Sequence, residues 1–248
     1  MKHNSGDIEA VALHGRYVSL IPLDPAVHAE RLYAACHGPA CEDLWRFLRD
    51  GPFPDVPTYR VHLESIAGLD GFMPFVIVDN ESRDVVGKVS LMRYSPTHRS
   101  VEIGYVLFAP VLRNSRGGTE ALCLLARHVF EYLGCRRCEW RSDAANQASA
   151  RAALRFGFHA EGVLRQHMIV KARSRDTAVF SLLDAEWPAR KAALHAWLEP
   201  ANFDSAGRQI VALRRSELSD LAPAEEARSP LEAPARYIAE GRPNPSSD

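Results

Sequence analysis

The sequence predicts a mixed α/β fold, α+β-like, in which a central, mostly antiparallel twisted sheet is flanked by helices. Stretches with strand-like alternation occur before and after stretches with helical spacing, so both element types belong to one domain. Residues 74–108 contain three strand-like runs joined by short polar turns, which is typical of an antiparallel meander. The chain has 248 residues, 46% of them hydrophobic, which is enough for a sizeable core.

The N-terminal third predicts one strand followed by helical segments. In order, these are a strand at 16–23 and helices at 25–36, 41–49 and 57–68. The helix at 25–36 has a clear start, because Asp24 is a suitable cap and Pro25 occupies the first helical position. Gly- and Pro-containing loops surround the short helical piece.

The meander is expected to consist of strands at 74–80, 84–94 and 99–108. Strict alternation in the third strand predicts two faces. Val101, Ile103, Tyr105 and Leu107 are expected on one face, and Glu102, Gly104, Val106 and Phe108 on the other. A helix beginning at Thr119 follows this strand.

The remaining chain predicts a strand at 136–142, a helix at 146–156, two strands at 162–172 and 176–187, and a helix at 188–198. Residues 219–248 are rich in Pro, Ala, Glu and Ser, a composition typical of disorder. The expected organisation is an N-terminal tail (1–12), one domain (13–187), a helical extension (188–217) and a disordered tail (218–248).

Composition argues against several function classes. A net charge of -1 gives no reason to expect nucleic-acid binding. No apolar run approaches the roughly 18 residues that a membrane span needs, and the N-terminus lacks a secretory signal, so a cytoplasmic location is expected. Cys135 and Cys138 have CxxC spacing. It is compatible with a zinc or redox site, but the lack of a second ligand pair favours small apolar residues entering a strand.

The segment from Arg113 to Thr119 joins the end of a strand to the start of a helix. It contains Arg113, Arg116 and the adjacent Gly117 and Gly118. Glycines allow a ligand to approach the backbone, arginines attract anions, and a helix N-terminus offers unpaired N–H groups. The segment predicts either a pyrophosphate site or an ordinary strand-to-helix loop. We expect Glu120 to point aside, because a carboxylate would repel a phosphate.

The same residues resemble the signature [QR]-x-x-G-x-[GA] of the GCN5-related N-acetyltransferase (GNAT) superfamily. Arg113 and Gly118 match its ends, whereas Arg116 stands where the pattern has glycine. A second block is similar to that family as well: Asn146, Ser149, Phe156-Gly157-Phe158 and Glu161-Gly162. Thr119-Glu120-Ala121 resembles the ribosomal-protein N-terminal acetyltransferase branch.

The resemblance implies a sheet with a V-shaped splay between two neighbouring strands, and acetyl-CoA as co-substrate without a metal. It further implies that the backbone of Val106, Leu107 and Phe108 pairs with the pantetheine arm. The pyrophosphate would be held by Arg113, Asn114, Ser115, Arg116, Gly117, Gly118 and Thr119. Asn146 would bond the CoA arm.

The resemblance also suggests catalytic residues for transfer of an acetyl group to an amine. Glu102 is the expected general base, and the alternative is an exposed glutamate. Ser149 is a candidate acid, and the alternative is a helix cap; the tyrosine often used by the superfamily is replaced by Ala153. The acceptor is expected to be a protein N-terminus or a small-molecule amine. A non-catalytic acyl-CoA-binding module is the competing hypothesis, and monomer and homodimer are both compatible with the sequence.

Overall fold

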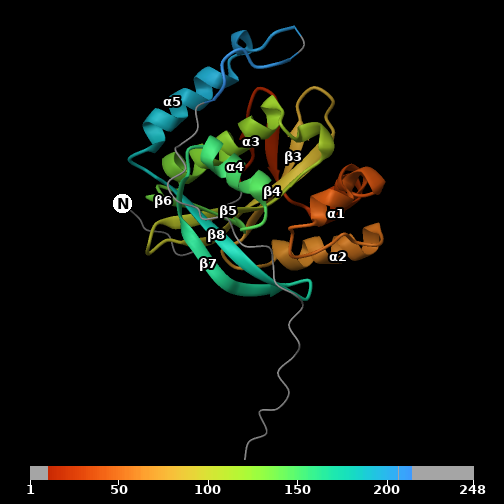
Figure 1. Ribbon diagram of the computed structural model, residues 1–248. Coiled ribbons are helices and arrows are strands. Elements are labelled where there is room, and N and C mark those ends of the chain that lie inside the picture. Colours follow the sequence, from red (N-terminus) through yellow and green to blue (C-terminus); the bar gives the residue numbers. More distant parts are fainter. Residues whose placement is uncertain (1–10, 206, 214–248) are drawn as a thin grey trace, which may run out of the picture.

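The computed structural model describes residues 11–205 and 207–213 (Figure 1). An eight-stranded sheet has the order β1-β2-β3-β4-β5-β6-β8-β7. The strands are β1 (Leu13–His14), β2 (Val18–Pro22), β3 (Met73–Asp79), β4 (Val85–Ser95), β5 (Ser100–Phe108), β6 (Arg137–Asp143), β7 (His159–Val170) and β8 (Arg173–Leu183). All neighbouring pairs are antiparallel except β5 and β6. The predicted fold class and meander are confirmed.

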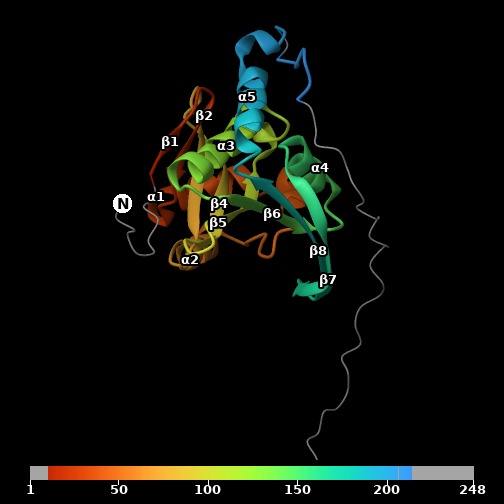
Figure 2. The same ribbon diagram turned by 90° about the vertical axis from the view of Figure 1, so that its left-hand side faces the viewer.

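Helices cover both faces of this sheet (Figure 1). They are α1 (Pro25–Cys36), α2 (Val56–Ala67), α3 (Arg116–Arg127), α4 (Gln147–Arg155) and α5 (Trp187–Leu198), with short helical turns η1 (Pro39–Trp45), η2 (Pro110–Leu112), η3 (His128–Tyr132) and η4 (Pro200–Asn202). α3, α4 and α5 share one apolar core, and α1 and α2 share another. In Figure 2 the β7–β8 hairpin extends beyond the rest of the sheet.

Strands β5 and β6 separate after a short paired stretch. Their parallel pairing joins Ser100–Ile103 to Arg137–Trp140. Beyond this point β6 pairs with β8, and β5 pairs with β4. Among the described residues, the edge of β5 that faces β6 has no strand partner from Gly104 to Phe108. The sheet therefore contains the V-shaped opening that the resemblance predicts.

A bulge in β5 changes which side chains share a face. Between two successive pairs β5 has one residue more than β4; the pairs are Lys88 with Leu107 and Ser90 with Gly104. Tyr105 lies in this interval with a φ of 51°. Val101 and Ile103 pack in the core beneath α3, but Leu107 packs with α1 and α2. The predicted unbroken alternation is therefore wrong, because the extra residue reverses the phase of the strand.

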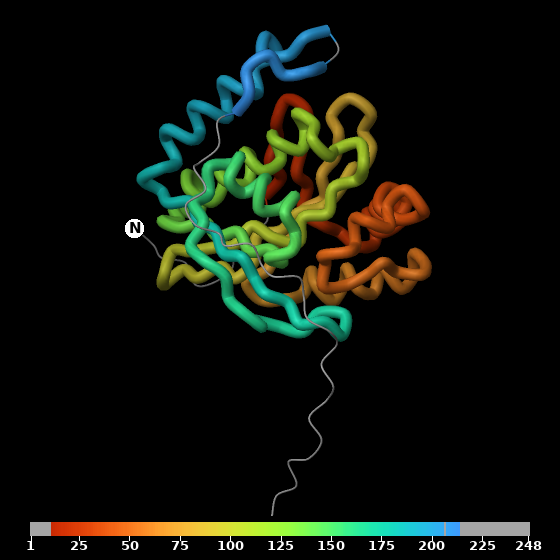
Figure 3. Tube along the Cα trace, in the orientation of Figure 1, coloured from red at the N-terminus to blue at the C-terminus, as the bar shows by residue number. Residues whose placement is uncertain are grey.

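The C-terminal extension belongs to the same core as the sheet. α5 begins at Trp187, and its buried Leu194 and Trp197 pack in the cluster that contains α3. Beyond α5, where Figure 3 colours the tube blue, Asn202 donates its amide to the carbonyls of Trp197 and Val211 at 3.0 and 3.1 Å. α5 thus begins one residue before the expected start of the helical extension at 188. Most of the expected N-terminal tail and all of the tail at 218–248 lie outside the described residues.

Candidate active site

α3 begins at Arg116, three residues before the position that the sequence predicts. The reason is its N-cap, Ser115, whose Oγ accepts the N–H of Gly118 at 3.0 Å. Thr119 donates its N–H to the Ser115 carbonyl at 3.3 Å. Within residues 11–205 and 207–213, the N–H groups of Arg116 and Gly117 have no hydrogen-bond acceptor. These free donors, at the positive end of the helix dipole, are suited to an anion.

The two glycines of this segment also have a packing role. Both are buried in the first turn of α3. A Cβ on Gly118 would lie 2.6 Å from the Leu112 carbonyl oxygen and 3.2 Å from the Phe108 ring. A Cβ on Gly117 would lie 2.9 Å from the Val18 side chain. The glycines therefore let α3 approach the end of β5 closely, whatever ligand binds there.

We expect Gly118→Ala to destabilise the fold by about 1–3 kcal/mol, because the added methyl group meets a backbone oxygen that cannot move freely. Denaturant unfolding measures the effect. Gly68→Ala is a matched control, since its Cβ would have 3.8 Å to the nearest backbone oxygen, and we expect a change within about 0.5 kcal/mol. Equal stability of the two variants would contradict the packing role.

The two arginines of the segment have different surroundings. Arg113 and Asn114 are exposed in the loop before α3. The Arg116 guanidinium lies between two aromatic rings, 4.9 Å from the ring centroid of Tyr17 and 5.0 Å from that of Phe203. The Arg116 side chain therefore connects α3 to the C-terminal extension. Only its backbone N–H is free to bind a ligand at the cradle, our name for the segment from Arg113 to Thr119 at the start of α3.

Glu120 points away from the cradle, as expected. Its buried carboxylate accepts three backbone N–H groups of the segment that joins β1 to β2. The donors are Arg16 at 2.8 Å, Tyr17 at 2.6 Å and Val18 at 2.9 Å. Glu120 thus stabilises the position of α3 against β2.

Glu102 is buried on the sheet face opposite α3. It is 5% exposed, so the exposed alternative is wrong. Its Oε2 accepts a hydrogen bond from Arg93 Nη1 at 2.6 Å, and Arg141 Nε lies 3.6 Å away. Burial raises the pKa of Glu102 above its ordinary value, while Arg93 and Arg141 act in the opposite direction. A raised pKa is a property of carboxylates that take up protons in catalysis.

Asn146 and Ser149 lie at the start of α4, on the α3 side of the sheet. Asn146 is the N-cap, and its Oδ1 accepts the N–H of Ser149 at 3.1 Å. The Ser149 hydroxyl accepts the indole N–H of Trp140 at 2.9 Å. Since accepting uses a lone pair, the Asn146 amide and the Ser149 O–H remain as donors. Asn146, not the Ser149 side chain, is the helix cap.

A second polar group near the bulge was not identified from the sequence. The Tyr105 hydroxyl donates to Asp50, in the loop after η1, at 2.6 Å. The ammonium of the fully buried Lys88 lies 4.9 Å from the Tyr105 ring centroid. Burial lowers the pKa of Lys88 to about 8. These residues come from distant parts of the chain, so the sequence does not show that they meet. The one feature that could have pointed to a site is the lysine among the apolar residues of β4.

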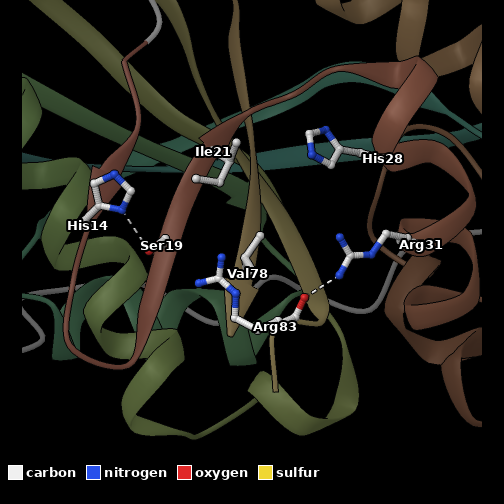
Figure 4. A pocket seen from close by; sticks show the side chains of 7 residues that line it. All are labelled: His14, Ser19, Ile21, His28, Arg31, Val78 and Arg83. Carbon is white, nitrogen blue, oxygen red and sulfur yellow. Dashed lines mark hydrogen bonds between the residues drawn. The ribbon is translucent and has the colours of Figure 1, made fainter. Parts of the chain in front are cut away.

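A hollow of about 400 Å³ lies at the other edge of the sheet (Figure 4). Its lining residues are His14, Ser19, Ile21, His28, Arg31, Val78 and Arg83. The polar groups largely bond one another: His14 Nδ1 is 3.1 Å from Ser19 Oγ, and Arg31 donates to the Arg83 carbonyl. β1, β2, β3, the turn after β3 and α1 line this hollow, so it is separate from the opening between β5 and β6.

The CxxC pair consists of buried, free cysteines, and burial raises the pKa of Cys135 to about 11. Across the described ranges, no three His, Cys, Asp or Glu side chains are arranged to hold a metal ion. In the same ranges, no helix has the length and apolar character needed to cross a membrane.

Comparisons with known proteins agree with this geometry. A family model described as an acetyltransferase (GNAT) domain matches residues 18–159. The chain is 42% identical to a GCN5-related N-acetyltransferase of known structure from Brucella melitensis, with a TM-score of 0.81, covering 83% of this chain and 93% of that one. It is 40% identical to a probable GNAT-family acetyltransferase from Chromobacterium violaceum, with a TM-score of 0.70 over 76% and 94% of the two chains.

The sequence is also similar to an uncharacterised N-acetyltransferase of Bacillus subtilis, YoaA, at 31% identity over 103 residues. That match covers 42% of this chain and only 58% of YoaA. The family model, in contrast, spans more than half of this chain and includes β5, the cradle, α3 and Glu102. The chain therefore belongs to the GNAT family of acyl-CoA-dependent acetyltransferases.

Proposed function

We propose that this chain transfers the acetyl group of acetyl-CoA to a primary amine, by direct attack of the amine in a ternary complex. One observation carries the proposal. The unpaired edge of β5, from Gly104 to Phe108, lies next in the chain to a helix start with free N–H groups at Arg116 and Gly117. An extended amide-containing arm fits an open strand edge, and a diphosphate fits a helix N-terminus.

On the donor side, the backbone of Val106, Leu107 and Phe108 would pair with the pantetheine arm. The free N–H groups of Arg116 and Gly117 would hold the diphosphate, with Arg113, Asn114 and Ser115 at its edge. Gly118 and Thr119 already donate their N–H groups to Ser115, so we assign them to shaping the turn.

Asn146 and Ser149 flank the same opening from α4. The Asn146 amide would donate to the CoA arm. The Ser149 O–H would protonate the leaving thiolate, with its oxygen held in position by the Trp140 indole. The side chains that approach the donor thus come from the α3 and α4 side of the sheet.

Glu102 lies on the other face, so the acceptor would approach from the side opposite α3. An alkyl amine with a pKa near 10 is mostly protonated at pH 7 and must lose a proton before it attacks. Glu102, buried and with a raised pKa, would take up that proton, directly or through a water molecule. The neutral amine would then attack the thioester carbonyl and form the amide bond as the C–S bond breaks. The second proton of the attacking nitrogen would be released and would replace the one that Ser149 gives to the thiolate.

A protein N-terminal α-amine and a small-molecule amine are both compatible with this site, and the similarity to the ribosomal-protein branch remains a prediction. The competing hypothesis is an acyl-CoA-binding module without catalysis. The tight contact of Arg93 with Glu102 favours it, because a carboxylate held by a guanidinium is a weaker base. The cytoplasmic location and the oligomeric state stay predictions from the sequence.

Thiol release from acetyl-CoA, followed with a panel of amines, tests the proposal. We expect release to require an amine and to yield the N-acetylated amine in equal amount by mass spectrometry. CoA binding without amine-dependent release would instead support the non-catalytic module. Failure to bind CoA at all would contradict the donor site itself.

The variants Arg113→Ala and Arg116→Ala distinguish the role of Arg113 in CoA binding from the role of Arg116 in stability. We expect Arg113→Ala to weaken CoA binding about 3- to 10-fold at unchanged stability, because an exposed guanidinium contributes one screened phosphate contact. We expect Arg116→Ala to lower stability by about 1–2 kcal/mol, because it loses contacts with the Tyr17 and Phe203 rings, at nearly unchanged affinity. Calorimetric titration and thermal unfolding measure the two effects, and the reverse pattern would contradict the assignment.

A further inference from the structure

A row of charged side chains crosses the sheet face that carries Glu102. In order across the sheet, the row contains Arg93, Glu102, Arg141, Glu139, Arg137 and Glu161. Arg141 Nη2 lies 2.7 Å from Glu139, and Arg137 lies 3.0 Å from the same carboxylate. Arg137 also donates twice to Glu161, at 2.6 Å each. The carboxylates of this row are therefore already paired with arginines.

Arg175 lies beside this row without such a partner. β6 and β8 remain paired beyond the point where β5 and β6 separate, as far as Asp143 and Thr177. Arg175 precedes Thr177 by two residues on β8, so the two side chains share a face of the sheet. It is only 9% exposed, and its buried Nε has no hydrogen-bond partner. In the part of the chain that the structure describes, no carboxylate lies within 4.0 Å of its guanidinium.

Further cations surround Arg175. The β7 bulge at 165–167 turns His167 onto Thr177, with Nδ1 and Oγ1 3.0 Å apart. Desolvation and four nearby guanidinium groups lower the pKa of His167; they belong to Arg141, Arg93, Arg175 and Arg49. Lys171, at the tip of the hairpin, donates to the Trp45 carbonyl at 2.8 Å and so joins the hairpin to the loop that contains Arg49. Positive charges from β4, β6, β8 and this loop therefore meet around the Glu102 site.

The carboxylates of Asp143 and Glu102 act on Arg175 only from beyond ion-pair distance, whereas burial and the nearby Arg49 and Arg93 oppose its charge. A guanidinium that is nine-tenths buried without a contacting carboxylate loses hydration and gains no ion pair in return. An anionic ligand group would supply both the missing hydrogen-bond acceptor and the missing charge, and arginine binds carboxylates with two parallel donors. A polycationic ligand would be repelled by the same residues. Arg175 and Arg49, which is exposed and likewise has no ion pair among the described residues, are the groups placed to receive such an anion.

We propose that the acceptor is an amine that carries an anionic group, most simply a carboxylate, a few bonds from its nitrogen. Arg175 and Arg49 hold the anion while the nitrogen faces Glu102. This inference rests on the acetyl transfer proposed above and narrows its substrate class. The carboxylate belongs either to a free amino acid or to an acidic first residue of a peptide.

The test compares acceptors that differ only in charge. One pair is an α-amino acid and its amide; the other is two peptides that begin with Glu or with Gln; spermidine represents the polyamines. We expect the full-length protein to favour the anionic member of at least one pair about 10-fold or more in kcat/KM, the contribution of a charge-assisted hydrogen bond. The pair that shows the preference distinguishes the two sources of the carboxylate.

Arg175→Met should abolish this preference while changing kcat/KM for the neutral amines less than about 3-fold. Arg49→Ala, at an exposed position, should reduce the preference as well. Arg173→Met removes a cation from the same strand at an exposed position and should keep the preference. A loss of rate for all acceptors alike in Arg175→Met and Arg49→Ala would mean a structural role and would overturn the proposal.

Product binding tests the anion site without catalysis, because it can be measured when no acetyl transfer occurs. With CoA present, we expect the wild-type protein to bind an N-acetyl amino acid about 10-fold more tightly than its amide, and Arg175→Met to bind both equally. Carboxylate-selective binding without transfer would leave this inference standing and reject the acetyl transfer. Transfer to neutral amines or spermidine in preference to the anionic acceptors would support the acetyl transfer and overturn this inference. Equal binding of the N-acetyl amino acid and its amide would also overturn it.

Discussion

Replacing Glu120 by alanine is expected to destabilise the protein by about 3 kcal/mol or more, because hydrogen bonds to a charged group contribute roughly 1.5–3 kcal/mol each. The carboxylate accepts three backbone N–H groups, at Arg16, Tyr17 and Val18, and it is buried. Alanine leaves these donors without a partner at the turn between β1 and β2. In a domain of this size, thermal unfolding should occur about 6–12 °C lower.

Glu30→Ala is the matched control, since Glu30 is an exposed residue of α1. We expect its stability to stay within about 0.5 kcal/mol of the wild type. Glu120→Gln keeps the shape but replaces one acceptor oxygen by a donor, so it should fall between the two. If Glu120→Ala unfolds at the wild-type temperature, the carboxylate does not stabilise the turn.

The same contact links fold to function, because Glu120 lies one helical turn after the start of α3. Arg116 precedes it by one helical turn and packs on Tyr17, in the same hairpin segment. Glu120 and Arg116 thus lie on the same side of α3, and both contact the segment that joins β1 to β2. The three hydrogen bonds of the Glu120 carboxylate hold the helix start in place. We therefore expect the loss of Glu120 to weaken CoA binding also in the folded fraction.

The sequence predicted those elements whose signals are local. Asp24 and Pro25 mark the start of α1, and the structure has both at those positions. The bulge at Tyr105 could not be predicted, because it depends on how β4 pairs with β5 and not on the β5 residues themselves. The start of α3 was placed too late because the glycines were taken as a loop. They form its first turn, capped by Ser115.

The site was predictable only where one segment supplies it. The strand end, the arginines, the glycines and the helix start all lie between Phe108 and Glu120, so the segment was identified although the helix start itself was placed three residues too late. The surroundings of Glu102 did not follow, since Arg93 and Arg141 reach it from two other strands. The sequence predicts that the basic turn from Lys171 to Arg175 either contacts a ligand or is solvated, and it favours the solvated turn. The burial of Arg175 could not be predicted, because it depends on the sheet register.

Glu102→Gln is expected to lower kcat for acetyl transfer by roughly 100- to 10,000-fold, the range for loss of a general base. The amide keeps the size of the side chain but takes up no proton. CoA affinity and thermal stability should remain near the wild-type values, because the donor site is on the other face. Glu139→Gln is the matched control. Glu139 lies opposite Glu102 in the register of β5 and β6 and also contacts Arg141, but it is not assigned to the proton transfer.

The pH dependence separates a base from a merely positioned carboxylate. Glu102 must be ionised to accept a proton, so kcat/KM should fall as the pH falls through its raised pKa. Arg93 favours the ionised form, and removing its charge in Arg93→Met should raise the pKa of Glu102 further. The acid limb of the profile then moves to higher pH while the plateau rate is retained. If Arg93→Met leaves this limb in place, or if Glu102→Gln keeps the full rate across the pH range, another group takes up the proton.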